Sequence, residues 1–269
     1  MEFVVEDGTY VYEVYGEGPP VVLLHGFTGS SSTWSSFISK YKAHFQLMVI
    51  DLPGHGQTNL HTPRDMASCC QDLRQLFIHL EVSPVHLVGY SMGGRTALSF
   101  ALTYPEMVRS LTLESSSPGL ATEMERMERV KNDEKLAKKI EQEGVEAFVN
   151  YWETIPLFET QRSLPNRVQA AIRKERLGHT AAGLANSLRY MGTGKQPSWW
   201  QALSRFEQPV QLMVGQLDRK FININQQMDE LFPKSLLQIV PQAGHAIHVE
   251  QPEMFGKLVN EFISQSVVS

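Results

Sequence analysis

The stretch HLVGYSMGGRTALSFA, residues 86–101, decides the fold. It joins an apolar run to a helix-like segment through the pattern G-x-S-x-G, formed by Gly89, Ser91 and Gly93. A sharp turn from strand to helix lifts such a serine hydroxyl above a sheet, and the glycines let the backbone fold tightly there. Because an apolar run precedes the pattern and a helical segment follows it, we interpret Ser91 as a catalytic residue. The alternative is a glycine-rich helix start without chemistry.

Apolar runs alternate with helical stretches along most of the chain. This alternation predicts an α/β fold, with a mostly parallel central sheet and helices on both faces. FVV and YVYEVYG flank the turn-forming EDGT and predict an opening hairpin. The further predicted strands are PPVVLLHG, FQLMVIDLPG, PVHLVGYS, RSLTLESSSPG, QPVQLMVGQLD and SLLQIVPQAGH, and the predicted helices lie near 64–80, 92–104, 224–231 and 252–266.

Residues 119–200 break this alternation. They contain helical periodicity and many charges but no candidate strand. We therefore predict a helical cap insertion at 119–200, placed on an α/β core domain formed by residues 1–118 and 201–269. The charged stretch 123–143 is typical of a helix with a solvated face.

The composition restricts the possible partners. With 42% hydrophobic and 20% charged residues, the 269-residue chain reads as an ordinary globular protein. The net charge of −5 argues against general nucleic-acid binding. The acidic N-terminus predicts no signal peptide, and no apolar run predicts membrane insertion. The adjacent pair Cys69 and Cys70 suits a reducing compartment. We expect a cytoplasmic monomer or weak homo-oligomer that acts on a small molecule.

A serine hydroxyl is almost fully protonated at neutral pH, so Ser91 needs a base. In folds with this turn the partners follow in the order serine, acid, histidine. His245 lies after the last predicted strand, and Asp218 lies at the end of the strand before it. Asp229 and Glu230 are weaker candidates for the acid because they fall in a helical segment. The HxxH pair of His245 and His248 has no evident third ligand, so we expect no metal.

LLHGFTGS, residues 23–30, supplies the remaining part of such a site. Phe27 follows the third predicted strand, where this architecture places one amide of an oxyanion hole, and Met92 after the serine supplies the other. Two N–H groups aimed at developing negative charge can contribute about 3–4 kcal/mol each to transition-state stabilisation.

These motifs carry a resemblance to known families. LLHGF, IDLPGHG, GYSMGG, the strand end at Asp218 and AGHAIHVEQPE resemble the α/β-hydrolase superfamily over the whole chain. LVGYSMGGR, ESSSPGL, ERMERVKND, FVNYWETIPLF, IRKERL and GQLDRKF resemble, more closely, the SHCHC synthase family of menaquinone biosynthesis. The resemblance implies an α/β-hydrolase fold with a helical cap. It also implies a lyase that eliminates pyruvate from 2-succinyl-5-enolpyruvyl-6-hydroxy-3-cyclohexene-1-carboxylate and gives 2-succinyl-6-hydroxy-2,4-cyclohexadiene-1-carboxylate (SHCHC).

The same resemblance assigns substrate-binding residues. The family's substrate is a small ring with three carboxylates, and Arg95, Arg129 and Arg176 match family positions. Guanidinium groups bind carboxylates bidentately, which lysine does less well. Tyr90 and Trp152 match family aromatics near the site. Each arginine could instead be a surface charge or structural ion pair, and each aromatic could be ordinary packing.

The implied reaction differs from hydrolysis. Ser91, His245 and Asp218 would remove a proton from the substrate ring, with Ser91 as a relayed base and no metal or organic cofactor. The first alternative is a carboxylester, lactone or thioester hydrolase that acts through an acyl-serine. The second is a non-catalytic α/β-hydrolase relative that binds a small ligand, although such relatives typically lose a triad member.

Overall fold

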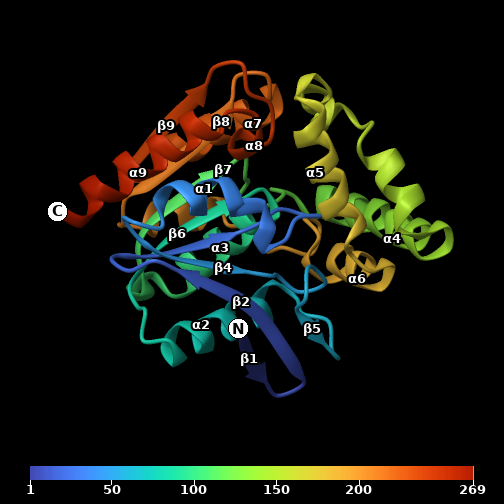
Figure 1. Cartoon of the computed structure of the whole chain (residues 1–269), viewed down its shortest axis with the longest axis horizontal. Coiled ribbons are helices and arrows are strands. Elements are labelled where there is room, and N and C mark those ends of the chain that lie inside the picture. The colour runs from blue at the N-terminus through green and yellow to red at the C-terminus, as the bar shows by residue number, and fades with distance from the viewer. Residues whose placement is uncertain (269) are drawn as a thin grey trace.

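The structure, a computed structural model, describes residues 1–268 of the chain. Its central sheet has the strand order β1-β2-β4-β3-β6-β7-β8-β9, with β5 paired to β2 (Figure 1). The strands from β3 onward in this order are parallel, as are β3 and β4, whereas β2 is antiparallel to its neighbours. The predicted α/β fold with a mostly parallel sheet is therefore confirmed. The strands are β1 (Glu2–Val5), β2 (Gly8–Tyr15), β3 (Pro20–Leu24), β4 (Gln46–Ile50), β5 (Asn59–Leu60), β6 (Val85–Tyr90), β7 (Val108–Glu114), β8 (Val210–Gly215) and β9 (Ser235–Val240).

Helices cover both faces of this sheet. The α-helices are α1 (Ser35–Tyr41), α2 (Met66–His79), α3 (Met92–Thr103), α4 (Glu123–Trp152), α5 (Asn166–Leu177), α6 (Ala181–Met191), α7 (Arg219–Leu231), α8 (Ile247–Glu250) and α9 (Pro252–Val268). Short 3₁₀ segments are η1 (Ser31–Trp34), η2 (Pro105–Met107), η3 (Pro156–Ser163) and η4 (Trp200–Arg205). Helices α2, α3 and α7 bury apolar side chains in one core cluster, and α1, α8 and α9 do so in the other.

The sequence of strand β6 is nearly all apolar because both faces of the strand are covered. Every residue of β6 is buried, and alternate side chains point to opposite faces of a strand. Leu87 therefore packs in the cluster below α2 and α3, and Val88 packs in the cluster below α1 and α9. A strand covered on both faces needs such a continuous apolar run.

Most of the predicted helices agree with the structure to within two residues, and the exception is α7. It begins at Arg219, five residues before the predicted start at 224. The Asp218 carboxylate accepts a hydrogen bond from the Phe221 amide and so caps the first turn, which the apolar pattern did not reveal. The short elements α1, β5 and α8 were not predicted either.

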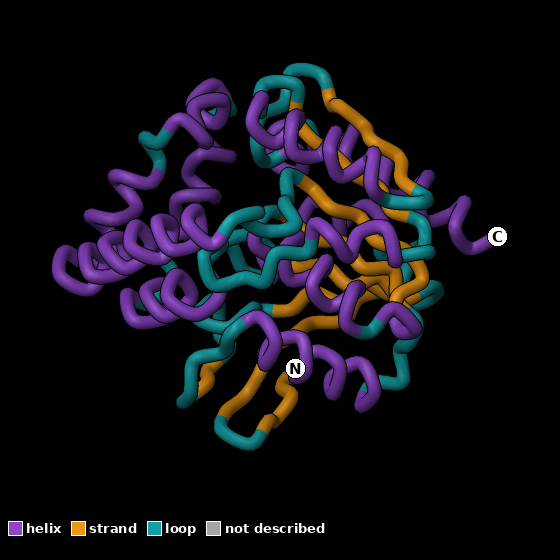
Figure 2. The backbone as a smooth tube through the Cα atoms, turned by 180° about the vertical axis from the view of Figure 1, so that it is seen from behind, coloured by secondary structure: helices purple, strands orange, loops and turns teal. Residues whose placement is uncertain are grey.

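Helices α4, α5 and α6 form a separate group beside the sheet (Figures 1 and 2). Between Thr122 and Gly192 the described chain contains helices and turns but no strand. The predicted helix 123–143 ends where Gly144, with φ of 84°, leaves the helical conformation. A small apolar cluster, which includes Ala137, Phe148 and Leu184, holds α4 against α6. The division into a core and a cap at 119–200 stays a prediction.

Candidate active site

Ser91 occupies a strained turn between β6 and α3. Its φ of 50° and ψ of −105° lie outside the regions that most residues adopt. A Cβ on Gly89 would lie 2.4 Å from the Gly93 carbonyl oxygen, and one on Gly93 would lie 2.0 Å from the Leu24 carbonyl oxygen. Only glycine fits at either position, so the glycines of the motif are required by close backbone packing. Strain of this kind is typical of functional sites.

The structure brings Ser91, Asp218 and His245 together. The distance from His245 Nε2 to Ser91 Oγ is 3.1 Å, and the distance from His245 Nδ1 to Asp218 Oδ2 is 2.6 Å. Asp218 follows β8, and His245 lies in the loop between β9 and α8. Both are nearly inaccessible to solvent, whereas Ser91 is partly exposed. Asp218, His245 and Ser91 are therefore linked by consecutive hydrogen bonds, as proton transfer between the serine and the histidine requires.

The two candidate oxyanion amides follow the ends of the neighbouring parallel strands β3 and β6. Phe27 lies just after β3, and Met92 is the first residue of α3. Within residues 1–268 neither amide donates a hydrogen bond to another residue, so both are available to an oxygen of a ligand. The loop after Phe27 is held by the Thr28 amide, which donates to His55 Nε2 at 3.2 Å.

Arg95 lies on the first turn of α3, where the helix dipole is already positive. Its Nη1 group donates to the Met191 carbonyl oxygen at 2.9 Å and to Gln196 Oε1 at 3.1 Å. Burial, with a smaller contribution from the charge of the nearby Arg129, lowers the pKa of Arg95 to about 10. Arg95 thus connects the serine turn to the chain after α6, which is a structural role beside any substrate contact.

Arg129 lies on α4 and forms an ion pair with Asp133. Its Nε group donates to Asp133 Oδ1 at 2.7 Å, and 42% of its side chain is exposed. Burial raises the pKa of Asp133, and its second oxygen has no hydrogen-bond partner among the described residues. The positive charges of Arg129 and Arg95 oppose this shift of the Asp133 pKa.

Arg176, on α5, is buried beside the candidate triad. It is 5% exposed, its guanidinium lies 4.6 Å from the centre of the Phe158 ring, and its Nη2 group donates to Gln161 Oε1 at 3.0 Å. Burial lowers its pKa, and the nearby Tyr90 opposes that shift. Glu153 lies 3.6 Å from its Nη1 group, which is too long for a strong charge-assisted hydrogen bond.

Aromatic side chains from the core and from residues 119–200 surround His245. Trp152 contacts Phe27 and Phe158, with ring centres 5.6 and 5.8 Å apart. Phe221 lies 4.7 Å from the His245 ring, and Phe158 lies 6.3 Å from it. The Trp152 indole N–H is buried and has no acceptor among the described residues. An apolar wall of this kind excludes water and strengthens the electrostatic interactions inside.

Sequence reasoning missed Phe158 and Phe221. Both lie in stretches that carried the family resemblance, FVNYWETIPLF and GQLDRKF. Their aromatic character in those stretches was the available signal. Tyr90, which was predicted, packs between the rings of His245 and His248 at 5.4 and 4.5 Å.

His248 and the cysteines lie in the protein interior. The His248 amide donates to Glu114 Oε1 at 3.0 Å, and its ring contacts the same buried carboxylate. No group of three or more His, Cys, Asp or Glu residues in the described part of the chain is arranged to hold a metal. Cys69 and Cys70 are free and buried in α2, and burial raises the pKa of Cys70 to about 12.

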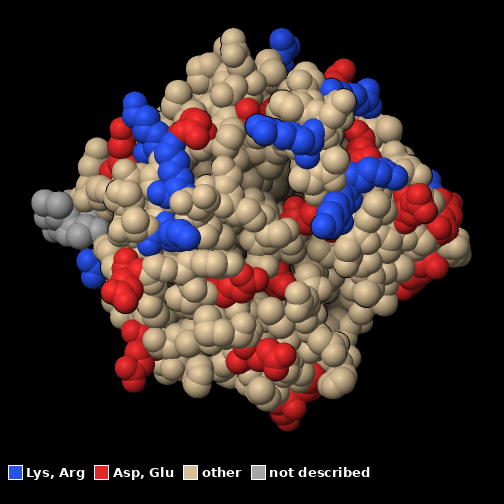
Figure 3. Space-filling model, in the orientation of Figure 1, with Lys and Arg blue, Asp and Glu red and all other residues tan. Residues whose placement is uncertain are grey.

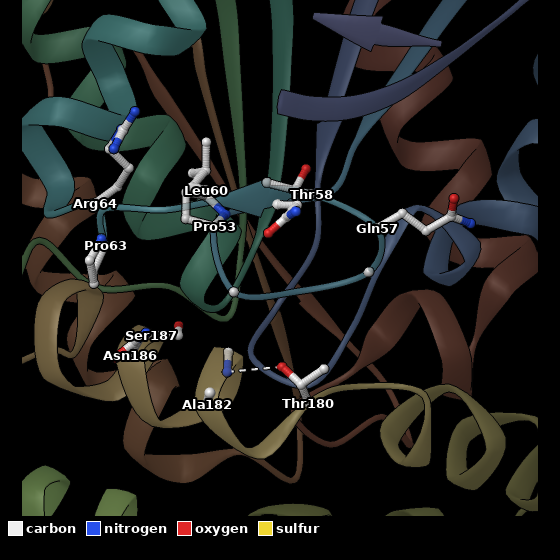
Figure 4. A pocket seen from close by; sticks show the side chains of 14 residues that line it. Pro53, Gln57, Thr58, Leu60, Pro63, Arg64, Thr180, Ala182, Asn186 and Ser187 are labelled. Carbon is white, nitrogen blue, oxygen red and sulfur yellow. Dashed lines mark hydrogen bonds between the residues drawn. The ribbon is translucent and has the colours of Figure 1, made fainter. Parts of the chain in front are cut away.

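A hollow lies where α5 approaches α7 and α8, and Lys and Arg side chains flank it (Figure 3). A different cavity of about 320 Å³ lies between residues 53–64 and the start of α6 (Figure 4). None of the triad residues or the three arginines lines that second cavity. Ser187, which lines this second cavity, donates a hydrogen bond from its hydroxyl to Met92 Sδ at 3.4 Å, so the cavity lies close to the residue that follows the serine.

No helix in the described chain has the length and apolar character of a membrane span.

Comparisons with known proteins identify the family of the chain. The profile described as alpha/beta hydrolase fold matches residues 19–252. A Bacillus subtilis protein provisionally named 2-succinyl-6-hydroxy-2,4-cyclohexadiene-1-carboxylate synthase is 47% identical over 98% of both chains. The synthase of that name from Photorhabdus laumondii is 30% identical over 93% of this chain and 87% of its own.

Solved structures point the same way. The structure of MenH from S. aureus has a TM-score of 0.92 and 34% identity, and the match covers 95% of this chain and 98% of that one. A malate-bound thermophilic esterase from Thermogutta terrifontis has a TM-score of 0.85 and 26% identity, over 96% and 94% of the two chains. The chain belongs to the α/β-hydrolase fold family and, within it, to the 2-succinyl-6-hydroxy-2,4-cyclohexadiene-1-carboxylate synthase family.

Proposed function

We propose that this protein is the lyase that forms 2-succinyl-6-hydroxy-2,4-cyclohexadiene-1-carboxylate by eliminating pyruvate from its enolpyruvyl precursor, in menaquinone biosynthesis. The observation that carries the proposal is the buried Arg176 guanidinium beside a hydrogen-bonded Ser–His–Asp set. A buried cation is costly unless it is closely paired, and the carboxylate of Glu153 lies 3.6 Å from Arg176 Nη1, beyond a strong charge-assisted hydrogen bond. A hydrolase of neutral esters has no use for such a cation. A substrate with three carboxylates supplies a close partner.

The proposed reaction begins with proton abstraction. Ser91 Oγ takes a proton from the substrate ring while its own proton passes to His245 Nε2. Asp218 accepts the Nδ1–H of His245, which holds the required tautomer and stabilises the imidazolium. The electron pair of the broken C–H bond forms a new ring double bond, the existing ring double bond shifts by one position, and the C–O bond to the enolpyruvyl group breaks. The proton on His245 can then return to the departing enolate, which becomes pyruvate.

The amides of Phe27 and Met92 are proposed to bind the succinyl carbonyl oxygen, where negative charge develops when the proton leaves. Arg95, Arg129 and Arg176 are proposed to bind the carboxylates. Only the Nε group of Arg129 is bonded to Asp133 in the described chain, so both Nη groups remain available for a bidentate contact.

The direct experiment mixes the enzyme with freshly prepared enolpyruvyl precursor and follows pyruvate release with a coupled assay. We expect rapid release that Ser91→Ala abolishes, because the serine carries the proton. Release no faster than the spontaneous reaction of the precursor would overturn the proposal.

The second candidate function is ester hydrolysis, because the Thermogutta esterase shares the fold at 26% identity. An esterase would form an acyl-serine and release it with water. We expect p-nitrophenyl esters to react far more slowly than the precursor. Hydrolysis at a rate comparable to pyruvate elimination would favour the esterase. A non-catalytic role is less well supported because all three candidate triad residues are present.

We further propose that the enzyme acts in the cytoplasm as a monomer or weak homo-oligomer. The two buried free cysteines on α2 support a reducing compartment. Fractionation of cells and sedimentation of the purified protein test these two statements.

A further inference from the structure

One oxygen atom of Glu175 joins α5 to the loop that follows the candidate oxyanion amide. Its Oε1 accepts hydrogen bonds from the Ser30 amide at 2.9 Å, the Ser30 hydroxyl at 2.7 Å, and the Ser32 and Thr33 hydroxyls at 2.8 Å each. Hydrogen bonds to a charged group are stronger than neutral ones. Within residues 1–268 the second carboxylate oxygen, Oε2, accepts no hydrogen bond.

His179 makes a second connection four residues later. Its Nε2–H donates to the Thr28 carbonyl oxygen at 2.9 Å, and its Nδ1 accepts from the Gly56 amide at 3.3 Å. Burial lowers the pKa of His179, which favours the neutral ring that both bonds require, with one donor and one acceptor. We call these bonds of Glu175 and His179 the α5 attachment.

Arg176 lies between the two connecting residues in sequence. On a helix, residues one apart differ by about 100° in direction. Glu175 therefore points toward the loop at Ser30 while Arg176 points toward Phe158, as their contacts show. The attachment sets the rotation of α5 and, with it, the position of the guanidinium.

Apolar packing gives α5 little other support. Arg176 is the buried residue of this helix, whereas α6 buries five residues, including Leu184, Leu188 and Met191. The N-terminus of α5 has no side-chain hydrogen-bond cap. A helix without a buried apolar stripe depends on polar contacts for its position.

We propose that Glu175 is a positioning residue of the active site, which acts by holding the Arg176 guanidinium in place for the substrate. This inference rests on the proposed function, because its kinetic readout is pyruvate release. Displacement of a binding group by about 1 Å can cost on the order of 100-fold in rate.

The first experiment compares Glu175→Ala, Glu175→Gln and a control in the pyruvate-release assay. Glu175→Ala is expected to lower kcat/KM by about 10- to 100-fold, mainly through a higher KM. Glu175→Gln is expected to retain most activity, because all four donors meet one oxygen that glutamine also supplies. The control is Glu146→Gln, which removes an exposed carboxylate from α4. A variant that merely loses folded protein would lower kcat and leave KM unchanged, which would overturn the proposal.

The second experiment asks whether Glu175 acts through Arg176. Glu175→Ala is introduced into wild type and into Arg176→Ala, and the two losses in kcat/KM are compared. We expect the second loss to be less than about 3-fold, because the group that Glu175 positions is already absent. An equal loss in both backgrounds would show that Glu175 acts elsewhere.

The third experiment needs no substrate. Amide hydrogen exchange is measured for residues 28–33 and 166–179 in wild type, Glu175→Ala and Glu146→Gln. We expect faster exchange in both segments of Glu175→Ala alone, at a nearly unchanged Tm. Unchanged exchange would show that Glu175 does not hold these two segments together. If wild type releases no pyruvate but exchange responds as expected, the proposed function fails and the attachment stands.

Discussion

The sheet core and the helices of residues 119–200 position their functional side chains in different ways. The proposed triad residues follow the ends of β6, β8 and β9, whose backbones are fixed by the parallel ladder. Arg129 and Arg176 lie instead on helices outside the sheet. An apolar cluster holds α4 against α6, whereas α5 is joined to the core by the hydrogen bonds of Glu175. Proton transfer needs distances fixed within a few tenths of an ångström, and a sheet provides them. A charge attracts a carboxylate over a longer range, so helices with polar contacts suffice.

The largest expected effect lies in the core. Ser91→Ala, His245→Ala and Asp218→Asn should each lower kcat by about 10⁴-fold or more, since they act as one proton-transfer unit. The check is pyruvate release by the single and double variants. If the double variants lose the product of the single losses, the residues act independently.

A matched pair of glycine substitutions compares the rigidity of the two regions. Gly93→Ala places a Cβ against the Leu24 carbonyl oxygen, which cannot move, and should destabilise the fold by at least about 3 kcal/mol. Gly144→Ala on α4 meets no atom within 4 Å and should cost only the strain of its φ of 84°, about 1–3 kcal/mol. Urea unfolding measures both. Equal losses would contradict the difference in packing.

Substitutions of the arginines test whether α4 and α5 contribute to substrate binding. Arg129→Ala and Arg176→Ala should each lower kcat/KM by roughly 10- to 150-fold and leave the Tm nearly unchanged. Lysine at either position should restore only part of the loss, because a point charge cannot make the two-pronged contact. Arg95→Ala should also lower the Tm, because Arg95 holds Met191 and Gln196. Near-wild-type kcat/KM for the first two variants would make them surface charges.

The free energy of unfolding should depend on pH through the buried His86 of the core. His86 is 1% exposed, and burial lowers its pKa to about 4, against about 6.5 when unfolded. The unfolded chain then binds more protons between these values, so stability is complete above pH 6.5 and falls as pH drops toward 4. We expect His86→Gln to reduce the difference in unfolding free energy between pH 7.5 and 4.5 by about 2 kcal/mol. An unchanged difference in urea titrations would assign the effect to other histidines.

The smallest expected effect lies on the exposed side of α6. Arg189 forms ion pairs with Glu134 at 2.8 Å and Glu141 at 2.6 Å on α4, all partly solvated. Arg189→Ala should lower the Tm by less than about 3 °C, and this difference should shrink in 1 M salt because exposed charges are screened. A larger loss that salt does not change would indicate packing by the Arg189 side chain.

Much of the site could be predicted because it depends on local pattern. G-x-S-x-G sets the turn at Ser91 through the close packing of Gly89 and Gly93. The chain order of serine, acid and histidine then identified Asp218 and His245, because strand ends meet at one edge of a parallel sheet. The start of α7 was missed because a polar cap at Asp218, not an apolar stripe, determines it.

The sequence by itself determined the fold class, the strained serine turn and the family, since each follows from short-range patterns of apolar, glycine and motif residues. Only the tertiary structure decided which polar side chains from distant segments of the chain contact one another around the site. Glu175 and Ser30 are 145 positions apart, and His179 and Thr28 are 151 positions apart. Contacts between polar side chains at such separations leave no periodicity in the sequence. They arise when the helices pack on the sheet and buried polar groups must find partners.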